Sequence, residues 1–207
     1  MSENPDLVNG LVLLAAYLVG GIPFGFLVGK MRGVDVRTVG SRNIGATNVY
    51  RTVGHAWGFL AFFCDFLKGL LPTLAAAHLA GQGGALAADL PVWTGLACVV
   101  GHTLTPYMRF KGGKGVATAF GMLVALIPWL VLVAFALFVV TVWLSHYISL
   151  GSCLAAAFLA VAIWIPTPLA HPSLPLQVAM TLLGAFVIVK HRSNLARLAK
   201  GCENKIY

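Results

Sequence analysis

Charge is the scarcest property of this sequence. Only 10% of its 207 residues are Asp, Glu, Lys or Arg, whereas a soluble domain has roughly 25%. Acidic residues are rarest, with six Asp and Glu against 14 Lys and Arg, and 59% of the chain is hydrophobic. The mean hydropathy of +0.88 agrees. A soluble globular protein is therefore excluded, and an integral membrane protein is indicated.

Motifs that bind metals are also missing. The four cysteines are scattered without a CxxC pair, and three of them lie within apolar runs. No HExxH motif is present, and the six histidines show no ligand spacing with cysteine or carboxylate. We therefore predict that the cysteines are small core residues, and we expect no disulfide, no metal and no cofactor.

The apolar residues gather into runs close to the roughly 20 residues that a helix needs to cross a hydrocarbon core. We predict an all-α integral membrane protein with about seven transmembrane helices and a single domain, residues 1–207. The fourth run is short, and its fusion with the fifth across Pro128 is an alternative. The predicted helices span residues 7–29, 57–80, 92–108, 116–127, 129–146, 148–165 and 176–189.

Basic residues are confined to three segments. Residues 30–54, 109–114 and 190–205 hold 13 of the 14 Lys and Arg, whereas segments 1–6, 81–91 and 166–175 hold none. With seven helices, all basic segments fall on one side of the membrane. The positive-inside rule then places the N-terminus outside and the C-terminus in the cytoplasm. Membrane topology and anionic ligands thus explain the net charge of +8, and no nucleic acid is expected.

The first basic loop, residues 40–54, reads GSRNIGATNVYRTVG. Its hydroxyls, amides, glycines and guanidinium are the chemistry of phosphate binding, because glycine lets the backbone approach closely and Arg can bind oxygens with two donors. The alternative is a topogenic loop with ordinary turn residues. The candidate phosphate ligands are Ser41, Asn43, Thr47, Asn48 and Arg51.

The second basic loop, residues 109–118, reads RFKGGKGVAT and leads into the fourth predicted helix. A glycine-rich turn before a helix N-terminus is typical of an anion site, and Lys111 and Lys114 add charge. Valine follows Gly115, so the sequence is not a Walker A motif and nucleotide hydrolysis is not supported. The alternative is a flexible turn that enters the helix.

The third basic segment, HRSNLARLAKGCENKIY, begins at His191. His191 and Asn194 are three residues apart, so they share a face if the seventh helix continues. His191 can donate a hydrogen bond or move a proton at the membrane edge, or it is structural. Arg192, Arg197 and Lys200 are predicted to be interfacial anchors.

Two ionisable residues lie inside the second predicted helix. Asp65 and Lys68 are three residues apart, so they can pair on one face and offset each other's cost of burial. Such a pair is either part of a functional site or a device that fixes helix packing. Elsewhere carboxylates are sparse, and neither the HxxxxD motif of CoA-dependent acyltransferases nor the aspartates of a CDP-alcohol phosphotransferase are present.

The three basic segments together resemble the signature motifs of a known family. GSRNIGATNVYRTVG, GHTLTPYMRFKGGKGVAT and HRSNLARLAKGCENKI look like those of the bacterial acyl-phosphate:glycerol-3-phosphate acyltransferases of the PlsY type, and DFLKG and GGIPFGFLVGK are also similar. Arg42 departs from the pattern, since glycine is expected there. The connection over residues 80–91 is longer than expected.

The resemblance implies transfer of a fatty acyl group from acyl phosphate to the 1-hydroxyl of sn-glycerol 3-phosphate, at the cytoplasmic face of a bacterial inner membrane. The expected products are lysophosphatidic acid and phosphate, and the expected partners are both substrates, the bilayer and a nearby enzyme that makes acyl phosphate. An organic-phosphate or lipid-head-group transporter is the alternative, and a non-enzymatic scaffold for anionic lipids is a third hypothesis.

The resemblance also assigns roles by motif position. The residues implied in catalysis are Ser41, Arg51, Lys114, His191 and Asn194. Those implied in substrate binding or loop shape are Asn43, Thr47, Asn48, Lys111, Gly112, Gly113 and Gly115. Asp65, Lys68 and Glu203 are expected to be structural, with Glu203 tying down the tail.

Overall fold

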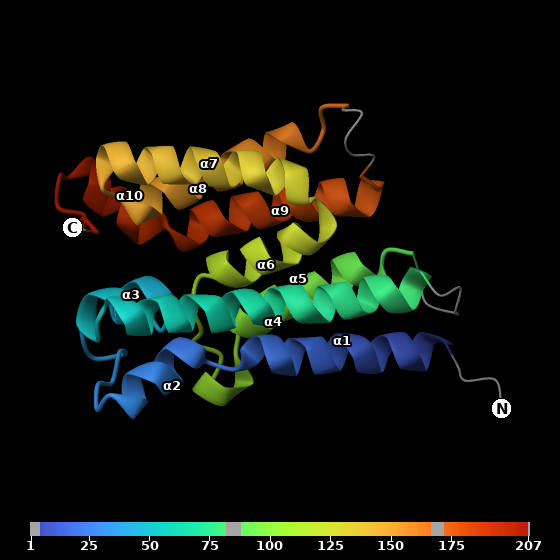
Figure 1. Cartoon of the computed structure of the whole chain (residues 1–207), viewed down its shortest axis with the longest axis horizontal. Coiled ribbons are helices and arrows are strands. Elements are labelled where there is room, and N and C mark those ends of the chain that lie inside the picture. Colours follow the sequence, from blue (N-terminus) through green and yellow to red (C-terminus); the bar gives the residue numbers. More distant parts are fainter. Residues whose placement is uncertain (1–4, 82–87, 167–171, 207) are drawn as a thin grey trace. The chain divides into compact units, whose positions relative to one another are not determined.

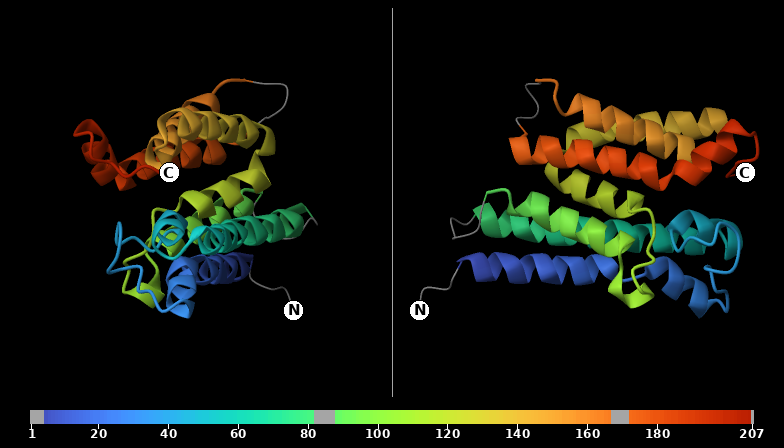
Figure 2. Two further views of the ribbon diagram at one scale, coloured as in Figure 1. Left: turned by 60° about the vertical axis from the view of Figure 1, so that its left-hand side comes forward. Right: turned by 180° about the vertical axis from the view of Figure 1, so that it is seen from behind.

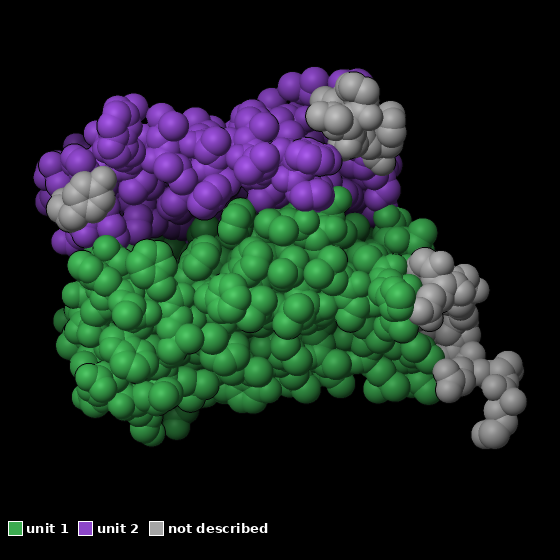
Figure 3. Space-filling view, in the orientation of Figure 1, with its two compact units in different colours: residues 1–126 green, residues 127–207 purple. Residues whose placement is uncertain are grey.

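The computed structural model describes residues 5–81, 88–166 and 172–206. About half of the predicted outer segments 81–91 and 166–175, and half of the long connection at 80–91, lie outside these ranges. The chain divides into two compact units, residues 1–126 and residues 127–207, which Figure 3 colours separately. Every regular element among the described residues is helical, which confirms the predicted all-α class.

In unit 1, α5 packs against α1, α4 and α6, and α4 also contacts α1, α2, α3 and α6 (Figure 1). The elements are α1 (Pro5–Gly21), α2 (Phe24–Met31), α3 (Ala46–Thr52), α4 (His55–Gly81), α5 (Leu90–Thr103), the 3-10 helix η1 (Pro106–Met108) and α6 (Val116–Leu126).

The first predicted helix is interrupted at Ile22 and Pro23, between α1 and α2. Proline has no N–H group, so carbonyls near the break lose helical partners. Two side chains replace them: Thr105 Oγ1 donates to the Gly21 carbonyl at 2.6 Å, and Lys68 Nζ donates to the Ile22 carbonyl at 2.7 Å. Because apolar surroundings offer no water for a carbonyl, these bonds stabilise the break.

Close helix packing in unit 1 depends on glycine. A Cβ on Gly20 would overlap the carbonyl of Cys98, and a Cβ on Gly69 would overlap that of Thr118. The first contact joins α1 to α5 and the second joins α4 to α6. Because glycine has no Cβ, the helix backbones can approach closely at these points, as in other pairs of membrane helices.

Unit 2 is a bundle in which α8 packs against α7 and α9, and α10 packs against the ends of α8 and α9 (Figure 2). Its helices are α7 (Pro128–Ser145), α8 (Ile148–Ala162), α9 (Leu174–Lys190) and α10 (Arg192–Ala199). The outer face of α7 is apolar, with Trp143 and Leu144 more than two-thirds exposed. Such exposure suits contact with lipid.

Three helical stretches among the described residues are long and apolar enough to cross a membrane: Asp6–Met31, His55–Ala80 and Pro128–Ser145. Leu174–Lys190 and Arg192–Ala199, bent by 54°, form a fourth if they count as one span. Val116–Leu126 and Ile148–Ala162 are shorter apolar helices. The crossing of the membrane by seven helices, and their orientation, remain predictions.

Proline explains one predicted helix boundary that differs from the structure and one that agrees with it. The third predicted helix, 92–108, ends as α5 at Thr103, and Pro106 starts η1 instead. The residue before a proline is disfavoured in the helical conformation, which favours an early end. The fourth and fifth helices do not fuse, because Ile127 has φ −143° and ψ 57° and Pro128 begins α7.

Candidate active site

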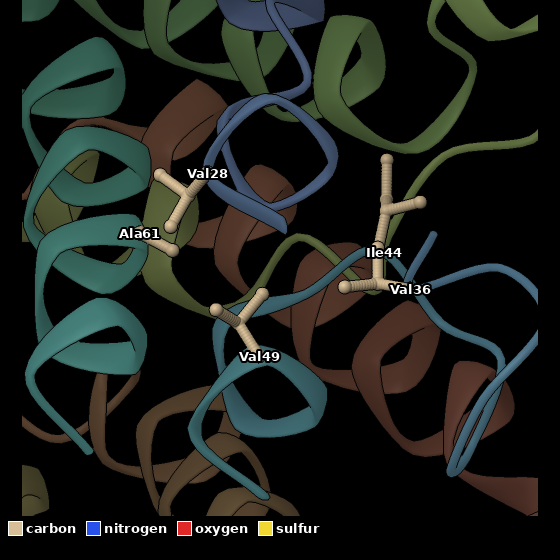
Figure 4. Close-up of a cluster of buried hydrophobic side chains, with 5 residues drawn as sticks. All are labelled: Val28, Val36, Ile44, Val49 and Ala61. Atoms are coloured by element: carbon tan, nitrogen blue, oxygen red, sulfur yellow. The ribbon is translucent and has the colours of Figure 1, made fainter. Parts of the chain in front are cut away.

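A buried apolar cluster lies beneath the first basic loop. It joins α2, the loop, α3 and α4, and its members are Val28, Val36, Ile44, Val49 and Ala61 (Figure 4). Met108, next to the second basic loop, packs against the same cluster. Both basic segments of unit 1 are therefore anchored at the same end of that unit.

Asn48 organises the first loop from inside. It is only 2% exposed. Its Nδ2 donates to the carbonyls of Val36 at 2.8 Å and Val39 at 3.2 Å, and its Oδ1 accepts from the Ser41 N–H at 2.9 Å. Both the donor and the acceptor groups of this side chain thus bind loop backbone, and one of them fixes Ser41.

Two neighbouring positions need a left-handed backbone. Gly40 has φ 57°, and a Cβ there would overlap Asn48 Oδ1, so glycine makes room for the asparagine. Arg42 also has φ 57°. This is the position at which the family resemblance predicts glycine, and the positive φ gives the physical reason for that expectation.

The remaining candidates of the first loop lie before α3 or within it. Ser41 is exposed, whereas Asn43, Thr47 and Arg51 are partly buried. Asn43 Oδ1 accepts from the Gly45 N–H at 2.8 Å, which shapes the turn immediately before α3. Arg51 lies in the last turn of this helix.

The second loop is attached to the C-terminal end of α5. The Gly112 N–H donates to the Thr103 carbonyl at 3.2 Å, and the Gly113 N–H donates to the His102 carbonyl at 3.1 Å. These two N–H groups therefore bind protein carbonyls instead of an anion. Of the anion-binding groups that the sequence predicts in this loop, the two lysines and the N-terminus of α6 are left. Gly115, with φ 81°, immediately precedes that helix.

The two basic loops of unit 1 attract anions strongly. They carry Lys30, Arg32, Arg37, Arg42, Arg51, Arg109, Lys111 and Lys114, and their one acidic residue is Asp35. Arg37 Nη2 lies 2.7 Å from Asp35 Oδ2. The side-chain hydrogen bond from Arg37 lowers the pKa of Asp35 to about 2. Asp35 and Arg37 offset each other, which leaves a large positive excess in the two loops.

In unit 2, the carboxylate of Glu203 gathers three side chains. Its Oε1 accepts from Asn194 Nδ2 at 2.6 Å and from Ser149 Oγ at 3.1 Å, and its Oε2 accepts from Arg197 Nε at 2.7 Å. Burial raises the pKa of Glu203, but the hydrogen bonds from Asn194 and Arg197 outweigh it, so the pKa lies below its ordinary value. Arg197, expected to be an interfacial anchor, is thus tied to this carboxylate.

His191 lies where α9 ends and α10 begins, and both it and Asn194 are buried. The seventh helix does not continue through this point, because the chain bends by 54°. His191 Nδ1 is 2.8 Å from the Val187 carbonyl. A carbonyl oxygen only accepts, so Nδ1 carries the hydrogen and Nε2 is the basic nitrogen of the neutral ring.

Asp65 and Lys68 are buried on α4 and pair at 2.8 Å. His102 is a third member that the sequence reasoning missed, with Nδ1 at 3.6 Å from Asp65 Oδ1. The only signal in the sequence is the Gly–His pair that begins the second family motif. Its distance from DFLKG along the chain hides the contact, which the packing of α4 against α5 creates.

The chain is similar to known proteins over nearly its whole length. A family model described as glycerol-3-phosphate acyltransferase matches residues 10–201. A glycerol-3-phosphate acyltransferase of Trichlorobacter lovleyi is 48% identical over 96% of this chain and 98% of its own length. One of Aquifex aeolicus is 40% identical over 94% of this chain and 97% of its own length.

Two solved structures are also similar. Both are crystal structures of PlsY, an integral membrane glycerol 3-phosphate acyltransferase, in its glycerol 3-phosphate and lysophosphatidic acid forms. They give TM-scores of 0.86 and 0.84 at 37% and 36% identity, and each covers 96% of this chain and 95% of the other. With a family model that spans nearly the whole chain, this protein belongs to the glycerol-3-phosphate acyltransferase family of integral membrane proteins.

Proposed function

We propose that the protein transfers a fatty acyl group from acyl phosphate to the 1-hydroxyl of sn-glycerol 3-phosphate at the cytoplasmic face of a bacterial inner membrane. The products are lysophosphatidic acid and inorganic phosphate. The observation that carries the proposal is the anchoring of two strongly basic loops at one end of unit 1, with Ser41 held by Asn48. The two ligand forms of PlsY agree with this substrate and product.

In unit 1, cationic and polar groups hold the phosphates. Ser41, Arg51 and Lys114 bind them directly, since hydroxyl and charged nitrogen donors suit phosphate oxygens. Lys111 adds charge, and Asn43 and Thr47 add polar contacts. Asn48 acts through Ser41, because its own amide is bonded to the loop backbone. Gly112, Gly113 and Gly115 shape the second loop.

In unit 2, His191 and Asn194 contact the substrates at the reacting end. The Val187 carbonyl fixes the His191 ring so that Nε2 is its basic nitrogen. Glu203 orients the amide of Asn194 by accepting from Nδ2. The two side chains thus have fixed orientations before substrate arrives, which is the condition for effective positioning.

The reaction needs no covalent acyl-enzyme. The hydroxyl oxygen attacks the acyl carbonyl, the new ester bond forms, and the bond from the carbonyl carbon to the phosphate oxygen breaks. The hydroxyl proton passes to the leaving phosphate or to His191 Nε2. Acyl phosphate is already activated, so positioning and charge stabilisation supply the rate enhancement.

The test is a phosphate-release assay with the purified protein in detergent or lipid cubic phase. Acyl phosphate and glycerol 3-phosphate together should release phosphate and form lysophosphatidic acid, and Ser41→Ala or Arg51→Ala should reduce the rate by about 100-fold or more. Uptake of glycerol 3-phosphate into proteoliposomes without phosphate release would replace the proposal by transport. Separate assays with acyl-CoA or with acylated acyl carrier protein as the sole donor test whether acyl phosphate is the donor that the protein uses.

Two further measurements examine the mechanism. Rapid quenching with radiolabelled acyl phosphate should trap no labelled protein, whereas an acyl-protein adduct would contradict direct transfer. His191→Ala should lower kcat if Nε2 takes the proton. A change confined to KM would instead assign His191 to binding.

A further inference from the structure

His102 lies between a buried ion pair and the glycine-rich loop. It is 5% exposed. On one side of its ring, Nδ1 is 3.6 Å from Asp65 Oδ1. On the other side, a Cβ built on Gly113 would overlap Nε2 and would lie 2.9 Å from Cε1. The ring edge that carries Nε2 therefore packs directly on the backbone of Gly113.

The backbone of the same histidine also holds the loop. The His102 carbonyl accepts from the Gly113 N–H at 3.1 Å, and the Thr103 carbonyl beside it accepts from the Gly112 N–H at 3.2 Å. Gly113 directly precedes Lys114 in the chain. The position of His102 therefore determines the position of the backbone from which the Lys114 side chain extends.

The ion pair gives His102 a rigid support. Lys68 Nζ lies 2.8 Å from Asp65 Oδ1, and it donates to the Ile22 carbonyl at 2.7 Å. Both side chains are buried on α4. Charges in an apolar interior are stable only when they are well paired and hydrogen-bonded, which restricts both groups to one geometry. A continuous series of contacts thus runs from the α1–α2 break to the second loop.

An ion pair that only joined helices would not need this histidine. Lys68 already offsets the charge of Asp65, and its bond to the Ile22 carbonyl already joins α4 to the α1–α2 break. What the contact between His102 and Asp65 adds is a fixed orientation of the imidazole ring. The opposite edge of that ring contacts the loop at Gly113.

We propose that His102 is a positioning residue of the acyltransferase: the Asp65–Lys68 pair holds its ring, and the ring sets the place of Gly113 and so of Lys114 for a substrate phosphate. The kinetic part of this inference rests on the proposed function. The structural part concerns the loop alone and is tested without activity.

Three variants of the full chain in detergent separate the two edges of the ring. His102→Ala removes both. His102→Asn retains an amide near the position of Nδ1, on the Asp65 side. His102→Gln carries an amide to the position of Nε2, on the Gly113 side. Thr73→Val is the matched control, because Thr73 is a buried polar residue of α4 that bonds the Gly69 carbonyl.

The first measurement is hydrogen–deuterium exchange, which needs no substrate. His102→Ala should speed exchange in a peptide covering residues 109–116 by about tenfold or more, equivalent to about 1.4 kcal/mol of local opening. Exchange within residues 60–75 of α4 should stay near wild type. His102→Gln should restore more loop protection than His102→Asn, and Thr73→Val should leave the loop unchanged.

The second measurement is the split between KM and kcat. His102→Ala should raise KM for glycerol 3-phosphate or acyl phosphate by about tenfold with a smaller change in kcat, and His102→Gln should recover most of it. Rescue by Asn rather than Gln, or normal loop exchange in His102→Ala, would overturn the proposal. If His102→Ala does not fold, the comparison of Gln with Asn still decides. An inactive wild type would refute the proposed function, while the exchange data would still judge the loop.

Discussion

The first basic loop and the C-terminal tail are each organised by one buried polar side chain, but the two organisers differ in charge. Asn48 is neutral, and its side chain binds backbone groups of its own segment. Glu203 is anionic and binds three side chains, from α8 and α10. The first device fixes backbone shape, and the second fixes side-chain orientation across helices.

This difference has consequences for how each region fails. A neutral amide does not titrate and is weakly affected by salt, so the first loop should keep its shape over a wide pH range. The bonds that Glu203 accepts depend on the negative charge of its carboxylate, because charge-assisted hydrogen bonds are stronger than neutral ones. The tail should therefore be stable near neutrality and sensitive to acid.

The largest effect is expected from Asn48→Ala. It leaves the buried Val36 carbonyl unsatisfied, which costs about 1–3 kcal/mol. It also removes the bonds to the exposed Ser41 N–H and to the Val39 carbonyl, which still accepts from the Arg42 N–H. We expect destabilisation of roughly 3 kcal/mol or more and loss of transfer, measured by thermal unfolding and phosphate release. Asn43→Ala loses one local bond and should cost about 1 kcal/mol. Equal stability losses in the two variants would remove the special role of Asn48.

Glu203→Gln should come next. The amide can still accept from Asn194 and Ser149, but these two buried bonds, like the one from Arg197, lose the negative charge that strengthens them. Bonds to charged groups are worth about 1.5–3 kcal/mol when they are buried, and less at the exposed Arg197. We expect a fall in kcat of about tenfold or more, since about 1.4 kcal/mol corresponds to tenfold in rate. A Glu203→Gln variant with full activity would show that the hydrogen-bonding shape of this side chain suffices without its negative charge.

Acid should weaken the tail before the first loop. Because the pKa of Glu203 is lowered in the folded protein, its stabilisation is complete above the ordinary Glu pKa of about 4.3 and is lost as pH falls through the lowered value. Exchange in residues 195–206, followed from about pH 6 to about pH 3, should converge for wild type and Glu203→Gln at the acidic end. Exchange in residues 40–54 should change less, and an earlier loss there would reverse the comparison.

A smaller effect is expected from Arg197→Ala. Its side chain is 36% exposed, and solvent screening reduces the worth of such a pair to about 1 kcal/mol. We expect a reduction in activity of a few fold, with Lys200→Ala, an exposed neighbour, close to wild type. Identical activities for the two variants would mean that Arg197 is only an anchor, as the sequence suggests.

The smallest effect is expected from Arg42→Gly. The left-handed backbone at Arg42 costs an arginine about 1 kcal/mol, and the flexibility of glycine in the unfolded chain offsets most of the gain. Thermal unfolding should shift by no more than a few degrees, and the enzyme should stay active. A large loss of activity would assign the Arg42 side chain to the site.

Several features were predictable from local sequence. Helical spacing indicates the Asp65–Lys68 pair, and apolar runs indicate most of the helices. The break at Pro23 and the early end of α5 were not predicted, because hydropathy does not register which carbonyls a distant Thr105 or Lys68 can satisfy. The hydrogen bonds of the Gly112 and Gly113 N–H groups were also unpredictable, because the carbonyls that accept them belong to the end of another helix, α5.

The sequence by itself determined the membrane class, the family and the candidate segments for the site, because composition, hydropathy and short motifs are local properties. Only the tertiary structure decided what individual polar residues do. Asn48 holds Ser41, Glu203 gathers Asn194 and Arg197, and His102 meets both Asp65 and Gly113. The physical reason is that a buried polar group must find partners, and which partners lie within hydrogen-bonding distance depends on how the helices pack.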